Sequence, residues 1–222
     1  MKMRHFHEEL AGLRKQISVM ADQVQESIQK AVEALLLKDL QAVDEVFKKE
    51  EIINRLEIEI DDKAYRLFAL GQPMAGDLRL IASILKVNSD LERLGDHGVN
   101  IAERALALAG ERPFEIDLQL PQMTAAVQKM LKDALQAFTQ TNMKLAQEVL
   151  ESDDVVDTYN DSLYARLEEH LQKDPSLIKT GMKLARIGHD LERIADLANN
   201  IAEDTFYLHA GKEVRHRFEM KL

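Results

Sequence analysis

Two segments of the chain carry the same acidic pattern one hundred residues apart. Residues 90–103 read DLERLGDHGVNIAE and residues 190–203 read DLERIADLANNIAE, and nine of the fourteen positions are identical. Each copy keeps a Glu and, four residues later, an Asp. Because residues three and four apart lie on one side of a helix, each copy places its carboxylates in one strip. Grouped carboxylate oxygens are ligands of hard and borderline cations, so each strip is a candidate cation site.

A second acidic stretch precedes each strip. Asp153 and Asp157 are four residues apart in ESDDVVDTYND, and the matching first-half segment, KKEEIINRLE, has Glu50 and Asn54 at the same positions. If each stretch lies on a helix beside the repeated strip, the oxygens of both converge on one groove. Acids spaced by four also occur on the solvated faces of many helices. Metal sites and solvated surface acids therefore both stay open as interpretations.

Two further residue types flank these acids. His97 follows Asp96, but the equivalent position in the second copy is Leu197, so His97 is not expected to belong to a site that is built twice. Arg93 and Arg193 each lie about 100° around the helix from the preceding glutamate. That orientation favours contact with a neighbouring helix over contact with the acidic strip.

The composition limits the classes of function. The chain has 222 residues, 29 basic against 39 acidic, and a net charge of −10, so nucleic acid and anionic lipid are not expected ligands. The lack of cysteine excludes thiolate nucleophiles and Cys-type zinc sites. There is no glycine-rich phosphate loop and no nucleophile motif, which predicts that the chain is not an enzyme. No signal peptide or membrane-spanning apolar run is apparent, so a cytoplasmic protein is expected.

The elements that must hold the acids are long helices. Apolar residues recur at intervals of three and four from Phe6 to Leu35, from Leu40 to Leu67 and from about Met74 to Ala109. The segment 111–121 holds two of the four prolines and breaks this period. Beyond it the plan repeats, with helices predicted at about 121–141, 143–171 and 175–210. We predict an all-α chain of six long helices in two tandem three-helix bundles, residues 1–112 and 113–222.

Two longer segments extend the pattern: QPMAGDLRLIASILKVNSDLERLGDHGVNIAE and ARIGHDLERIADLANNIAEDTFYLHAG. They resemble the two signature segments of the PhoU family of phosphate-signalling regulators, and the resemblance covers essentially the whole chain. It implies two three-helix bundles whose acidic motifs bind metal ions, including multinuclear iron clusters. The implied metal ligands are Glu50, Glu92 and Asp96 in the first half and Asp153, Asp157, Glu192 and Asp196 in the second. Asn54 departs from the motif, and although Glu51 or Glu57 could compensate for it, the second site is expected to bind a cation more tightly.

The resemblance also implies a role and partners. A PhoU-like chain is expected to be a regulatory adaptor that helps keep phosphate-starvation genes off when phosphate is plentiful. Its implied partners are the ATPase of the phosphate ABC transporter and the sensor histidine kinase, with the membrane reached only through them, and a homodimer is expected. Iron or zinc is the expected cofactor, with magnesium or manganese as alternatives. The residues singled out as partner-facing are Asp77, Arg79, Arg93 and Arg193.

Two other functions stay open. A ferritin-like di-iron carboxylate enzyme is also a helical bundle with paired acids, but it needs Glu-x-x-His on two helices. Only His216 follows a glutamate by three residues, and the pair Glu213–His216 lies in the tail. A structural helical adaptor without metal is the third interpretation, because a fold alone does not give a function.

Overall fold

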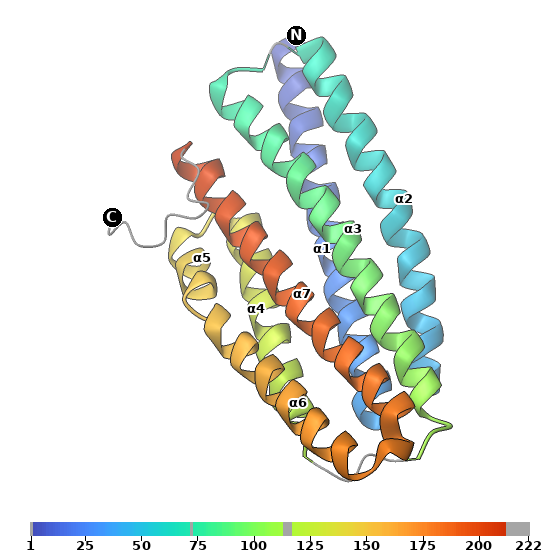
Figure 1. Cartoon of the computed structure of the whole chain (residues 1–222). Coiled ribbons are helices and arrows are strands. Elements are labelled where there is room, and N and C mark those ends of the chain that lie inside the picture. Colours follow the sequence, from blue (N-terminus) through green and yellow to red (C-terminus); the bar gives the residue numbers. More distant parts are fainter. Residues whose placement is uncertain (1, 72, 113–116, 212–222) are drawn as a thin grey trace.

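The chain folds almost entirely into helices (Figure 1). The computed structural model describes residues 2–71, 73–112 and 117–211, and no strand occurs within these ranges. The helices are α1 (Lys2–Leu37), α2 (Leu40–Gly71), α3 (Ala75–Leu108), α4 (Leu120–Gln140), α5 (Met143–Leu150), α6 (Asp153–Lys173), the 3₁₀ turn η1 (Pro175–Leu177) and α7 (Ile178–Ala210). None of the described helices combines the length and the apolarity that crossing a bilayer requires.

The helices form two bundles of three rods each, which confirms the predicted architecture. Helices α1, α2 and α3 pack against one another, and α4, the α5–α6 segment and α7 form the second bundle. Short turns make successive rods antiparallel, and the bundles meet mainly along α3 and α7 (Figure 1). The helix α1 also packs on α4.

One predicted helix is wrong: residues 143–171 form two helices, not one. The chain turns at Glu151 and Ser152, between α5 and α6. The backbone N–H of Ser152 donates to the Val149 carbonyl oxygen at 3.0 Å, and its hydroxyl donates to the same oxygen at 2.7 Å. Both bonds compete with the ordinary helical pairing. The new helix starts with Asp153 and Asp154 in its first turn, where carboxylates stabilise the positive end of the helix dipole.

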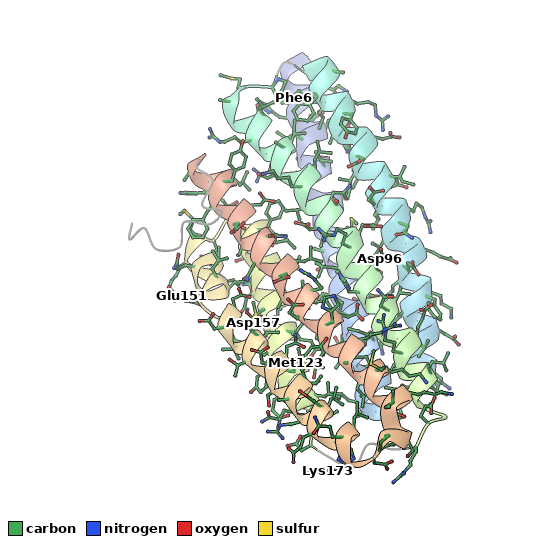
Figure 2. The ribbon with its side chains drawn as sticks, in the orientation of Figure 1. Phe6, Asp96, Met123, Glu151, Asp157 and Lys173 are labelled. Carbon is green, nitrogen blue, oxygen red and sulfur yellow. The ribbon has the colours of Figure 1, made fainter. Side chains whose placement is uncertain are left out.

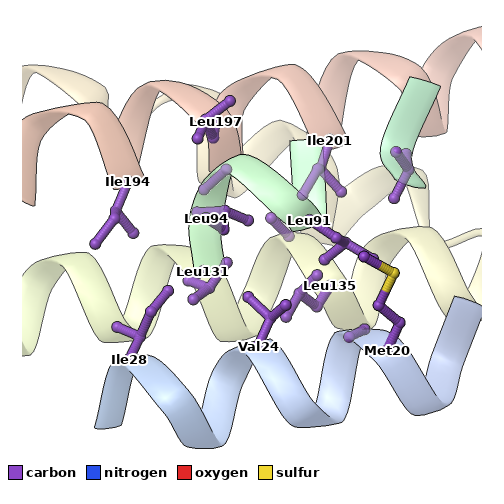
Figure 3. Packing of buried hydrophobic residues seen from close by; sticks show 14 of the residues in the cluster. Met20, Val24, Ile28, Leu91, Leu94, Leu131, Leu135, Ile194, Leu197 and Ile201 are labelled. Atoms are coloured by element: carbon purple, nitrogen blue, oxygen red, sulfur yellow. The ribbon is translucent and has the colours of Figure 1, made fainter. Parts of the chain in front are cut away.

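A single hydrophobic cluster spans both halves of the chain. At its centre, side chains of α1, α3, α4 and α7 interdigitate, among them Met20 and Val24, Leu91 and Leu94, Leu131 and Leu135, and Ile194 and Ile201 (Figure 3). The repeats therefore share this cluster, and a smaller second cluster lies within the second half: Leu118, Leu163, Leu167 and Leu184. The division between residues 112 and 113 stays a prediction, because residues 113–116 lie outside the described residues.

Ion pairs cross from one bundle to the other along α3 and α7. Asp190 on α7 is 4% exposed, and it binds Arg104 of α3 and lies 3.0 Å from the Nδ1 atom of His97. In a second pair between α3 and α7, the Nζ atom of Lys86 lies 3.2 Å from the Oδ1 atom of Asp204, which is 2% exposed. Ion pairs with buried carboxylates thus restrict how α3 and α7 can pack against each other more than apolar contacts alone would.

Candidate metal centre

In the first half, helices α2 and α3 bring three of the predicted ligands together. Glu50 lies on α2, and Glu92 and Asp96 lie on α3, which packs beside it. Burial raises the pKa of Glu50 above its ordinary value, and the charge of Asp96 is the next cause. The pKa of Glu92 is raised in the same way, by burial first and then by Asp96 and Glu57. The three carboxylates lie near enough to one another along the α2–α3 contact for their charges to act on each other's pKa.

In the second half, α6 and α7 form the equivalent groove. Burial raises the pKa of Asp153, whose carboxylate also accepts a hydrogen bond from the Asn199 side chain, and the charges of Asp157 and Asp196 raise it further. The pKa of Asp157 is raised by burial and then by Asp196. Figure 2 labels Asp96 and Asp157, which lie on different flanks of the molecule, one in each bundle. The carboxylates of the second groove therefore act on one another as those of the first do.

The fourth predicted ligand of the second half, Glu192, has other partners. Its carboxylate lies 3.2 Å from the Nδ1 atom of His189 and 3.9 Å from the Nε atom of Arg193. Arg193 also donates to Asp196 at 2.7 Å. The Arg193 guanidinium thus already neutralises part of the negative charge of these acids.

The expectation that both arginines reach a neighbouring helix is wrong. Arg193 pairs with Asp196 and Arg93 pairs with Asp90 at 3.5 Å, each three residues away on its own helix. Residues three apart lie on one side of a helix, so each arginine can reach an aspartate of its own helix although it points away from the glutamate that precedes it. The two arginines differ in one respect that matters for metal binding: Arg193 pairs with a predicted ligand, whereas Arg93 pairs with Asp90 and acts on the predicted ligand Glu92 only through its charge, which lowers the pKa of that carboxyl.

A family model described as "PhoU domain" matches the chain twice, at residues 17–105 and 120–205. The chain belongs to the PhoU family. It is 41% identical over 209 residues to the phosphate-specific transport system accessory protein PhoU homolog of Aquifex aeolicus, and the match covers 94% of this chain and 95% of that protein. The homolog of Pseudomonas aeruginosa with the same description is 36% identical over 215 residues, covering 96% of this chain and 88% of that protein.

Solved structures agree with this assignment. The crystal structure of PhoU from Pseudomonas aeruginosa matches with a TM-score of 0.89 at 35% identity, covering 93% of this chain and 100% of that chain. The phosphate transport system regulatory protein PhoU from Streptococcus pneumoniae matches with a TM-score of 0.85 at 34% identity, covering 94% and 99%. The family is one of accessory and regulatory proteins, which favours the adaptor over the ferritin-like enzyme.

The predicted ligands of this PhoU-family chain have donor atoms suited to a cation, but they are not arranged around a single point where one could bind. Every predicted ligand offers carboxylate oxygen, the donor that hard and borderline cations take. Among the described residues, however, no three His, Asp or Glu side chains stand close enough together to hold one ion. A cation would be held by three or more of these acids only if their side chains rotated toward one another.

Three residues near the grooves were not among the predicted ligands. Glu57 and Glu103 are neighbours of Glu92 and Glu50 in the first half, and Asn199 binds Asp153 in the second. The sequence pointed to both glutamates: Glu57, two helical turns from Glu50, was a candidate to compensate for Asn54, and Glu103 is part of the repeated strip. Asn199 has no such signal, because Val99 occupies the equivalent position in the first half.

Proposed function

We propose that this chain is a regulatory adaptor of a phosphate transport system, without catalytic activity of its own. The observation that carries the proposal is the match to PhoU homologs over nearly the full length, in both repeats. Those homologs are described as accessory proteins of the phosphate-specific transport system. Long exposed helical faces suit a protein whose output is contact with other proteins.

The proposed partners are the ATPase of the phosphate ABC transporter and the sensor histidine kinase of the phosphate response. In this role the chain acts in the cytoplasm, as a homodimer, and represses phosphate-starvation genes when phosphate is plentiful. A net charge of −10 favours basic patches on the partners. Association with them should weaken as salt rises, because screening shortens the reach of exposed charges.

We further propose that each acidic groove binds a cation that tunes these contacts. The ligands would come from Glu50, Glu92 and Asp96 in the first groove and from Asp153, Asp157, Glu192 and Asp196 in the second. Iron or zinc bound through carboxylates suits this donor set, as do magnesium and manganese. The raised pKa values of Glu50 and Asp153 support the proposal, because a cation relieves the repulsion that contributes to them.

The test of the adaptor role is capture from cells grown with and without phosphate. The bait is the wild type or a variant in which Ala replaces the acids of both repeated strips: Glu92, Asp96, Glu192 and Asp196. The control variant loses the same number of charges at exposed acids outside the grooves: Asp44, Glu59, Glu148 and Glu169. We expect wild type and control to capture the transporter ATPase or the kinase, and the groove variant to capture less. Capture of neither partner under any condition refutes the adaptor role, and equal capture by the groove variant refutes the tuning by cations.

The arginines give a sharper test of the metal proposal. Arg193 competes with an added cation for Asp196, whereas Arg93 pairs with Asp90 outside the predicted ligand set. Titration of chelator-treated protein with Mn²⁺ should therefore show tighter binding in Arg193→Gln and little change in the matched variant Arg93→Gln. Equal affinity in wild type and in a Glu192→Ala/Asp196→Ala variant would remove the second groove from consideration.

A further inference from the structure

A cavity of about 430 Å³ lies where the start of α3 meets the end of α7. Its walls come from four separate segments: Arg14 on α1, Asp77 and Arg79 on α3, Thr141 in the turn after α4, and His209 on α7. Figure 1 shows α7 ending beside the first turns of α3, on the side of the molecule where α1 begins. Along α3, Arg79 is thirteen residues, or roughly 20 Å, from Glu92, so the cavity is separate from the acidic groove.

Cations outnumber acids in this cavity, although the chain as a whole is strongly acidic. Two guanidinium groups line it, and among the described residues that do so the one acid is Asp77. Within the described part of the chain neither Arg14 nor Arg79 forms a salt bridge. The Nε atom of Arg79 is buried and has no hydrogen-bond partner. The Arg79 side chain as a whole is half-buried, and this one shielded nitrogen would gain an acceptor from a bound anion.

The first turn of α3 adds further donors. The residue before it, Met74, is extended and offers no side-chain cap, so the first backbone N–H groups of α3 lack partners within the helix. Gly76 lines the cavity, and a Cβ atom placed on it would meet nothing within 4 Å. The cavity thus lies at the start of α3, the positive end of its helix dipole.

Thr141 supplies an independent observation. It closes α4 in the left-handed conformation, with φ of 52°, where a β-branched residue is a clear outlier and glycine is the usual choice. Its backbone N–H donates to the Phe138 carbonyl oxygen at 3.2 Å. Glycine would satisfy the same turn with less strain, so a threonine that lines this cavity has a cost that a polar contact with a ligand would offset.

We propose that this cavity binds a small tetrahedral oxyanion of the phosphate class. Arg79 and Arg14 donate charged hydrogen bonds, the start of α3 contributes backbone N–H groups, and the Thr141 hydroxyl donates from the opposite wall. Asp77 faces the same space and disfavours an anion, which makes the two guanidinium groups necessary. The Arg79 side chain lies beside Gly211, the residue after α7: a Cβ on Gly211 would lie 3.4 Å from its Nη1 atom. The site goes beyond the proposed adaptor role and does not depend on it.

The test is titration of the purified full chain with inorganic phosphate, at low ionic strength and after removal of metal ions with a chelator. Removing metal matters, because a cation in an acidic groove would attract phosphate independently of the cavity. The test variant is Arg14→Gln/Arg79→Gln, and the control is Arg186→Gln, which removes an exposed arginine from α7. We expect saturable binding in wild type and control, weakened by about tenfold or more in the double variant, since each lost charged hydrogen bond costs at least that much.

Thermal unfolding gives a second readout on the same proteins. Phosphate should raise the Tm of wild type and of Arg186→Gln, and should raise that of the double variant clearly less at the same concentration. Sulfate and glycerol 3-phosphate serve as further probes, and a preference for the phosphomonoester would identify an esterified phosphate as the ligand. The same affinity in wild type and double variant, or no binding at millimolar phosphate in metal-free wild type, overturns the proposal. Neither result depends on capture of a transporter or kinase.

Discussion

Replacement of Asp190 by Asn should be among the most damaging single changes at the contact between the repeats. The Asp190 side chain is 6% exposed and holds two groups of the other repeat, Arg104 and His97. Asn keeps the size and shape of the side chain but removes its charge. It leaves the Arg104 guanidinium, 23% exposed, without its carboxylate.

The expected loss of stability follows from these contacts. Removing one partner of a buried ion pair costs about 3–5 kcal/mol. Arg104 and His97 keep some access to water, so the low end of that range, about 3 kcal/mol, is expected. For a chain of this length each kcal/mol shifts the Tm by roughly 2–4 °C, which predicts a fall of about 6–12 °C.

Calorimetric or circular-dichroism melting of wild type and Asp190→Asn measures this loss. The matched control is Glu169→Gln, which breaks the Lys173–Glu169 pair, whose side chains are 69% and 70% exposed. That change should stay within about 0.5 kcal/mol of wild type. Replacing both charges with apolar groups, in Arg104→Met/Asp190→Leu, should cost less than Asp190→Asn alone. If Asp190→Asn melts with the control, the contact between the repeats rests on apolar packing and the reasoning fails.

Two further predictions concern the groove and the cavity. Because the pKa values of Glu50 and Glu92 are raised in the folded chain, their ionisation costs stability, and that cost grows as pH rises from about 4 through the folded pKa values. In metal-free buffer Glu50→Gln/Glu92→Gln should therefore be more stable than wild type at pH 7, by about 0.5 kcal/mol, and equal to it below pH ~4 in urea titrations. Thr141→Gly should relieve the strain of the left-handed backbone, increase the free energy of unfolding by about 0.5–1 kcal/mol and so raise the Tm. The same change should weaken phosphate binding. A fall in Tm would contradict the strain argument.

The helices and the acidic strips could be predicted from sequence because each depends on a local period. Steps of three and four place Leu91 and Leu94 in the core, and the same arithmetic places Glu92 and Asp96 on the flank. The turn at Ser152 was missed, although Ser followed by two Asp residues is a signal for a helix start. The apolar period continues through that point, and it outweighed the local signal.

Contacts between the repeats could not be predicted, because no period relates their residues. His97 was not expected in a repeated site because its equivalent is Leu197, and nothing in the sequence indicated its partner Asp190, which lies 93 residues away on another helix. The cavity is a stronger case. Arg14, Arg79, Thr141 and His209 are distant in sequence, and only the packing of α3 against α1 and α7 brings them together.

The repeats differ where they touch, and the difference determines which repeats can pair. Lys86 meets Asp204, and Arg104 meets Asp190. Positions 104 and 204 are equivalent, yet one is Arg and the other Asp. If two first repeats packed in this way, Lys86 would face Arg104, and if two second repeats did so, Asp190 would face Asp204. Like charges in such a buried place are strongly unfavourable. The acids in the grooves are repeated because each repeat presents its own groove to solvent. The residues along α3 and α7 diverge because both pairs, Lys86–Asp204 and Arg104–Asp190, are attractive only when a first repeat packs on a second repeat.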